Sequence, residues 1–166
     1  MEEWQFMQAL PQDLNAILGL IRQRIAWMDQ KGLEQWNKTD YFSAFPPEYF
    51  AQAIREGHIY VLCTKEPRRV IGLISLKEED SYWPKDNKNC CYMHNLATNA
   101  AFPGAGRALL GHCEEQARRW GKEYLRLDCQ RDNNKLNQYY ENLGFMPVGT
   151  VEDAPYYGIR REKKLR

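Results

Sequence analysis

Apolar residues that recur three and four positions apart predict a long helix near the start of the chain. Its buried face is expected to carry Leu14, Ile17, Leu18, Ile21, Ile25 and Met28. Pro11 and Asp13 are typical of a turn followed by a helix N-cap, and Gly32 suits the C-terminal end. A shorter helix is expected to begin at Pro47 and to end at Gly57. Its inward positions are Phe50, Ala53 and Ile54.

In the second half of the chain, apolar residues three and four positions apart predict two further helices. A helix over residues 106–120 is expected to bury Leu109, Leu110, Cys113, Ala117 and Trp120. A short helix over residues 134–143 is closed by Gly144.

Between these helices the apolar residues alternate or form short runs that predict strands. The expected strands cover residues 4–10, 59–63, 70–76, 90–98, 124–129, 145–151 and 157–164. The order of elements predicts one α/β (α+β) domain over residues 1–166, with a mixed central sheet of six to seven strands and flanking helices. The strand, helix and strand over 90–129 form a crossover, so these two strands are expected to be parallel.

The composition argues against several classes of protein. The 166 residues include 23 basic and 22 acidic side chains, so the formal net charge is +1. This near-neutral balance does not indicate a basic surface that would bind nucleic acid. The acidic start and the lack of a long apolar stretch indicate a soluble cytoplasmic protein with no membrane partner. The five cysteines are expected to be buried thiols rather than a disulfide framework.

A metal site is not expected, although Cys90, Cys91 and His94 lie close together in the sequence. No second Cys/His pair stands at ligand spacing, and neighbouring side chains of a strand point to opposite faces.

Gly104 and Gly106 lie between an expected strand and an expected helix, where backbone N–H groups can bind an anion. A Walker A loop is excluded because no Gly-Lys-Ser/Thr run is present. A dinucleotide-binding loop is disfavoured because Leu109 stands where a third Gly or Ala is needed, although Asp128 supplies an acidic residue downstream.

A third interpretation rests on two motifs taken together. The first is Gly104, Gly106 and the Leu109-Leu110 pair, and the second runs from Asn133 to Phe145. The matching positions of the second motif are Asn133, Tyr140, Glu141, Leu143, Gly144 and Phe145. With this order and spacing, residues 92–150 resemble the GNAT superfamily of N-acetyltransferases. One departure is Ala101, where the family commonly has Gln or Arg.

The resemblance implies an acetyl-CoA-dependent enzyme that transfers an acetyl group to a primary amine by direct attack in a ternary complex. It implies that acetyl-CoA lies where the parallel strands 90–98 and 124–129 splay apart, with no metal. The residues implied to bind it are Leu96, Thr98, Gly104, Ala105, Gly106, Arg107, Ala108, Asn133 and Tyr140.

The resemblance makes Tyr140 the general acid toward the departing thiolate, a role that suits a phenol because it is protonated at neutral pH. Packing in the core is the alternative role for Tyr139 or Tyr140, and capping of the helix is a compatible role for Asn133. His94 is a candidate general base, although a strand histidine is more often a satisfied sheet residue.

The segment between the first two helices is implied to border the acceptor, with Glu34, Gln35 and Trp36 as candidate substrate-binding residues and Glu34 as a second candidate base. Its aromatic character suits a small or partly hydrophobic amine, and a lid that packs on the core is the alternative. A small molecule or a protein could supply the amine. A non-catalytic acyl-CoA-binding or regulatory module is the competing function, and a homodimer is compatible with the sequence.

Overall fold

The computed structural model describes residues 3–166, which form two compact units. Unit 1 holds residues 3–76 and 94–113, and unit 2 holds residues 77–93 and 114–166. The expectation of one domain over the whole chain stays a prediction.

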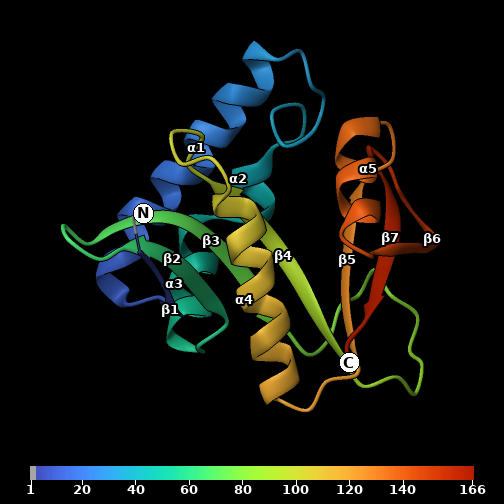
Figure 1. Ribbon diagram of the computed structural model, residues 1–166. Helices are drawn as coiled ribbons and strands as arrows, with labels where there is room; N and C mark the ends of the chain where they lie inside the picture. Colours follow the sequence, from blue (N-terminus) through green and yellow to red (C-terminus); the bar gives the residue numbers. More distant parts are fainter. Residues whose placement is uncertain (1–2) are drawn as a thin grey trace. The chain divides into compact units, whose positions relative to one another are not determined.

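Unit 1 combines an antiparallel sheet with the first helices, in blue to green in Figure 1. Its elements are β1 (Trp4–Gln8), the 3₁₀ helix η1 (Pro11–Asp13), α1 (Leu14–Gln30), α2 (Tyr41–Ala44), α3 (Pro47–Arg55), β2 (Ile59–Thr64) and β3 (Arg69–Lys77). Strand β2 pairs antiparallel with both β1 and β3. Helix α2 was not predicted, because four residues are too few to show a helical period.

Three elements have residues in both units: β3, whose last residue Lys77 belongs to unit 2, β4 (Cys90–Thr98) and α4 (Ala105–Arg119). Unit 2 adds β5 (Tyr124–Gln130), α5 (Asn134–Asn142), β6 (Met146–Asp153) and β7 (Tyr156–Lys164), in orange to red in Figure 1.

The seven strands form one mixed sheet in the order β1-β2-β3-β4-β5-β7-β6, which confirms the predicted sheet. Strand β4 is parallel to β5, and its pairing covers Cys90–Tyr92 opposite Tyr124–Arg126. Strand β7 is antiparallel to both β5 and β6.

The helix faces read from the sequence are confirmed with a few exceptions. Phe50, Ala53 and Ile54 of α3 are buried, as is most of the predicted apolar stripe of α1. Trp120, predicted to face inward, is 41% exposed because α4 ends at Arg119 and the chain turns away there. In the described part of the chain no helix is long and apolar enough to cross a membrane.

Asp13 stands at the N-cap position of α1, as predicted, but its backbone is helical and its side chain makes no cap hydrogen bond to α1. The buried carboxylate instead accepts hydrogen bonds from the Leu10 N–H (2.8 Å) and from both terminal nitrogens of Arg68 (2.7 and 2.9 Å). Burial works to raise the pKa of Asp13, but Arg68 and the Leu10 N–H outweigh it and hold the pKa below its ordinary value. Sequence patterns did not reveal this pair, because its residues are far apart in the chain.

Candidate functional site

The loop between β4 and α4 is held in shape by Asn99. Its N–H donates to the Ile71 carbonyl (2.8 Å), its Oδ1 accepts from the Ala101 N–H (2.9 Å), and its carbonyl accepts from the Phe102 N–H (3.0 Å). The turn after β4 is therefore tied to β3 before the chain reaches Gly104. Ala101, where the family that the sequence resembles commonly has Gln or Arg, is exposed, and the loop is tied by the bonds of Asn99 instead.

Gly104 ends this loop in the left-handed region, with φ +87°. A Cβ built on it meets no atom within 4 Å, so the space beside it is open. The first helical bond of α4 runs from the Ala108 N–H to the Gly104 carbonyl (3.0 Å), which leaves the N–H groups of Gly106 and Arg107 without an acceptor inside the helix. These N–H groups and the helix N-terminus attract an anion, so the residues present fit a diphosphate.

Three predicted residues of β4 share one face of the strand. His94, Leu96 and Thr98 are half-buried and alternate with the buried Asn95 and Ala97. All five lie in unit 1, as does the loop that carries Gly104. The structure thus brings the predicted β4 residues and the predicted diphosphate loop onto one continuous stretch of chain.

Asn95 was not singled out from the sequence, yet its backbone and its side chain are both unusual. It has φ +58°, a left-handed conformation in the middle of a strand. Its buried side chain donates from Nδ2 to the Tyr41 hydroxyl (2.6 Å) and accepts at Oδ1 from the Tyr49 hydroxyl (3.3 Å). The available signal in the sequence was a lone asparagine inside an apolar strand.

The predicted acceptor segment lies next to these tyrosines in unit 1. Trp36 stacks on Tyr41 with ring centroids 4.5 Å apart and packs against the apolar core. Glu34 is exposed, and the Gln35 Nε2 is buried without a hydrogen-bond partner among the described residues. Trp36 therefore packs against the core of unit 1, whereas Glu34 and Gln35 retain polar groups that an acceptor could use.

The other two predicted residues lie on α5 in unit 2. Asn133 is the N-cap of this helix, because its Oδ1 accepts from the Leu136 N–H (3.0 Å). Tyr140 is 7% exposed and packs edge-on against Phe145 (5.9 Å) and Tyr139 (5.5 Å), whereas Tyr139 is 36% exposed. The capping role of Asn133 is confirmed.

Helix α5 is fixed to the sheet of unit 2 through Asn137, which the sequence did not reveal. Its Nδ2 donates to the carbonyls of Gln130 (3.0 Å) and Asn133 (3.0 Å). Its Oδ1 accepts from the Nε and the second terminal nitrogen of the buried Arg161 (3.2 and 3.1 Å). Asn137 lies one turn from Asn133 and one turn from Tyr140, so these bonds set the position of both residues.

Burial raises the pKa of four of the cysteine thiols, those of Cys63, Cys90, Cys91 and Cys129. All five are buried free thiols, as predicted. Burial raises the pKa of the Cys129 thiol to about 11, and its Sγ contacts the Asn137 Oδ1 at 3.3 Å. A thiol that stays protonated at neutral pH is a poor nucleophile, which favours direct attack by the amine over an acyl-enzyme.

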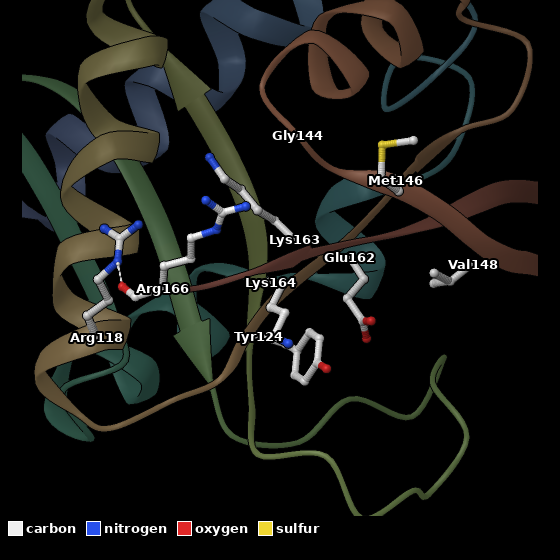
Figure 2. A pocket seen from close by; sticks show the side chains of 9 residues that line it. All are labelled: Arg118, Tyr124, Gly144, Met146, Val148, Glu162, Lys163, Lys164 and Arg166. Carbon is white, nitrogen blue, oxygen red and sulfur yellow. Dashed lines mark hydrogen bonds between the residues drawn. The ribbon is translucent and has the colours of Figure 1, made fainter.

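A pocket of about 510 Å³ lies in unit 2, at its C-terminal end (Figure 2). It is lined by Arg118, Tyr124, Gly144, Met146, Val148, Glu162, Lys163, Lys164 and Arg166. Several of its charges are already used: Arg118 donates to the Arg166 carbonyl (3.0 Å), and Lys163 pairs with Glu114 (2.6 Å). None of the residues predicted to bind a substrate lines this pocket, so it does not enter the functional argument.

The mixed sheet with its parallel pair β4 and β5, and the glycine loop that leads into a helix N-terminus, are the features expected of an acyltransferase of the acetyl-CoA-dependent class. The sequence model of the acetyltransferase (GNAT) family matches residues 23–145. The chain therefore belongs to this family and is a GNAT-type N-acetyltransferase.

Known proteins agree with this assignment. An uncharacterized N-acetyltransferase of Bacillus subtilis, YesJ, is 24% identical over 159 residues, which cover 91% of this chain and 85% of YesJ. A GNAT-family acetyltransferase structure from Listeria monocytogenes superimposes with a TM-score of 0.80 at 24% identity, over 99% of this chain and 96% of that one. The structure of the PaiA N-acetyltransferase of Thermoplasma acidophilum, in complex with coenzyme A, superimposes with a TM-score of 0.77 at 17% identity. The match covers 98% of this chain and 99% of that one.

Proposed function

We propose that this protein transfers the acetyl group of acetyl-CoA to a primary amine, by direct attack in a ternary complex. The observation that carries the proposal is the tied loop before α4, where Gly104 and the N–H groups of Gly106 and Arg107 suit a diphosphate. Acetyl-CoA supplies the thioester from which the acetyl group is taken.

Residues 104–108 bind the diphosphate through backbone N–H groups and the α4 N-terminus. Backbone groups of β4 near Leu96 and Thr98 pair with the pantetheine arm, and one N–H there polarises the acyl carbonyl. Asn133 uses its Oδ1 for the helix cap, which leaves its amide nitrogen to bind the arm.

Tyr140 protonates the departing thiolate, for which its phenol must lie within hydrogen-bond reach of the sulfur. His94, half-buried on β4, removes a proton from the amine through water, and Glu34 is the second candidate for this base. Glu34 and Gln35 border the acceptor, which is a small-molecule or protein amine.

Gly104→Ala tests the donor site. An alanine at φ +87° is strained by about 1–2 kcal/mol, so the loop is expected to change shape and acetyl-CoA affinity to fall about five- to thirtyfold. Isothermal titration of the purified protein with acetyl-CoA measures this affinity. Titrations with NADH and ATP are the controls that show whether the protein binds other nucleotides.

Gly111→Ala is the matched control. Gly111 lies inside α4 with no atom within 4 Å of an added Cβ and without a positive φ. Alanine there is expected to stabilise the helix by up to about 1 kcal/mol and to leave acetyl-CoA affinity unchanged. Absence of acetyl-CoA binding by the wild-type protein, or equal affinities of Gly104→Ala and wild type, would contradict the proposed donor site.

A further inference from the structure

The buried side chain of Asn95 occupies a position that the proposed chemistry does not yet use. It is 8% exposed, and it lies between His94 and Leu96, two residues of the proposed site. Burying an amide is costly unless its donors and acceptors are satisfied. Here the Asn95 Nδ2 donates to the Tyr41 hydroxyl (2.6 Å), and the Asn95 Oδ1 accepts from the Tyr49 hydroxyl (3.3 Å).

The backbone of Asn95 determines where the next peptide group points. In a regular strand the backbone N–H groups point toward the neighbouring strands. A residue in the left-handed region turns the peptide group that follows it away from this direction. At φ +58° Asn95 makes such a turn, and the group that it redirects is the N–H of Leu96. Asparagine tolerates this conformation better than the apolar residues around it.

The two tyrosines connect this turn to the predicted acceptor segment. Tyr41 begins α2 and carries Trp36 stacked on its ring, and Tyr49 lies on α3. Phe45 contacts both tyrosine rings, with centroids 5.0 Å from each. The aromatic segment that we propose to border the acceptor is thus joined by hydrogen bonds to the strand that we propose to hold the acyl group.

We propose that Asn95 is a positioning residue: its amide, fixed between the Tyr41 and Tyr49 hydroxyls, holds the Leu96 N–H in the direction of the acyl carbonyl. The inference rests on the proposed function, because it needs an acyl group at β4. Asn95 itself touches neither donor nor acceptor. Its effect passes through the Leu96 peptide group.

The test uses acetyl-CoA labelled with ¹³C at the acetyl carbonyl. A hydrogen bond to this carbonyl moves its ¹³C resonance downfield, so the wild-type complex is expected to show a downfield shift from free acetyl-CoA. Asn95→Gly keeps a backbone that accepts φ +58° but loses both hydrogen bonds. We expect this variant to lose more than half of the shift, with acetyl-CoA affinity within about threefold because the Gly104 loop is untouched.

With an acceptor amine, the same variant is expected to lose about 10- to 100-fold in kcat while the KM for acetyl-CoA stays unchanged. Tyr41→Phe removes the shorter hydrogen bond and keeps the ring packing, so it carries the test if Asn95→Gly does not fold. Tyr60→Phe removes a hydroxyl elsewhere in unit 1, one that accepts a hydrogen bond from the Gln8 Nε2, and is expected to change neither the shift nor kcat.

The outcomes separate the inference from the proposed function. If wild-type protein binds labelled acetyl-CoA with a shifted carbonyl, and Asn95→Gly and Tyr41→Phe retain that shift and kcat, the positioning role is overturned alone. A wild-type complex whose carbonyl is unshifted also overturns it. If wild-type protein does not bind acetyl-CoA, the proposed function is overturned together with the inference that rests on it.

Discussion

Replacing Tyr140 by Phe is expected to lower kcat for acetyl transfer by about 10²- to 10⁴-fold while acetyl-CoA affinity stays unchanged. The change removes one hydroxyl and keeps the ring that packs against Phe145 and Tyr139. The loss is confined to the chemical step because only the developing thiolate needs the proton. Initial rates of thiol release, measured over both substrates, separate kcat from KM.

Tyr139→Phe is the control for this prediction. The two tyrosines are neighbours on α5, but Tyr139 is 36% exposed and Tyr140 is 7% exposed. The Tyr139 variant is expected to retain wild-type kcat. Equal kcat for Tyr140→Phe and wild type would assign Tyr140 to packing alone, and another group would then have to protonate the thiolate.

Replacing Arg126 by Ala is expected to lower the free energy of unfolding by about 3–5 kcal/mol. The buried guanidinium donates to Glu162 (2.7 Å), to Asp86 (2.7 Å) and to the Tyr92 hydroxyl (2.9 Å). It also lies over the Trp83 ring at 4.5 Å. Removal of the arginine leaves Glu162, which is 9% exposed, with Lys88 as its remaining cationic partner.

The charge state of Arg126 supports this expectation. Burial works to lower its pKa, but the hydrogen bonds to Asp86, Glu162 and Tyr92 outweigh it and raise the pKa above its ordinary value. The guanidinium is therefore charged whenever the protein is folded.

Urea unfolding of Arg126→Ala and Arg131→Ala measures the contribution of the cluster. Arg131 is 45% exposed and lies 3.8 Å from its two carboxylate partners, so its loss is expected to cost less than about 1 kcal/mol. If both variants lost the same small amount of stability, the buried cluster around Arg126 would not stabilise unit 2.

The fold could be predicted from the sequence wherever the hydrophobic period was long enough. The helix that begins at Pro47 and the parallel pair of β4 and β5 are confirmed, because periodicity and the crossover rule depend on local residues. The buried pairs of Asp13 with Arg68 and of Arg126 with Glu162 join distant residues, so no local pattern reveals them.

Only those residues of the candidate site that belong to a sequence motif could be predicted. Gly104 and Tyr140 follow from motif positions, and their roles stay predictions. Asn95 and Asn137 were missed because each looks like an ordinary polar residue in its element, and their importance appears only with their partners. Asn95 has a positive φ, and its side chain is hydrogen-bonded to Tyr41 and Tyr49, which lie 54 and 46 residues away in the chain.

Acetylation of an amine at the expense of acetyl-CoA is the most direct test of the account. The purified protein is incubated with acetyl-CoA and a panel of small amines, amino acids and peptide N-termini, and free CoA thiol and acceptor mass are measured in the same samples. We expect thiol release that depends on one class of amine and equals the amount of acetylated amine. Saturable acetyl-CoA binding without release or acetylation across the panel would contradict the enzyme assignment and favour a non-catalytic acyl-CoA-binding module.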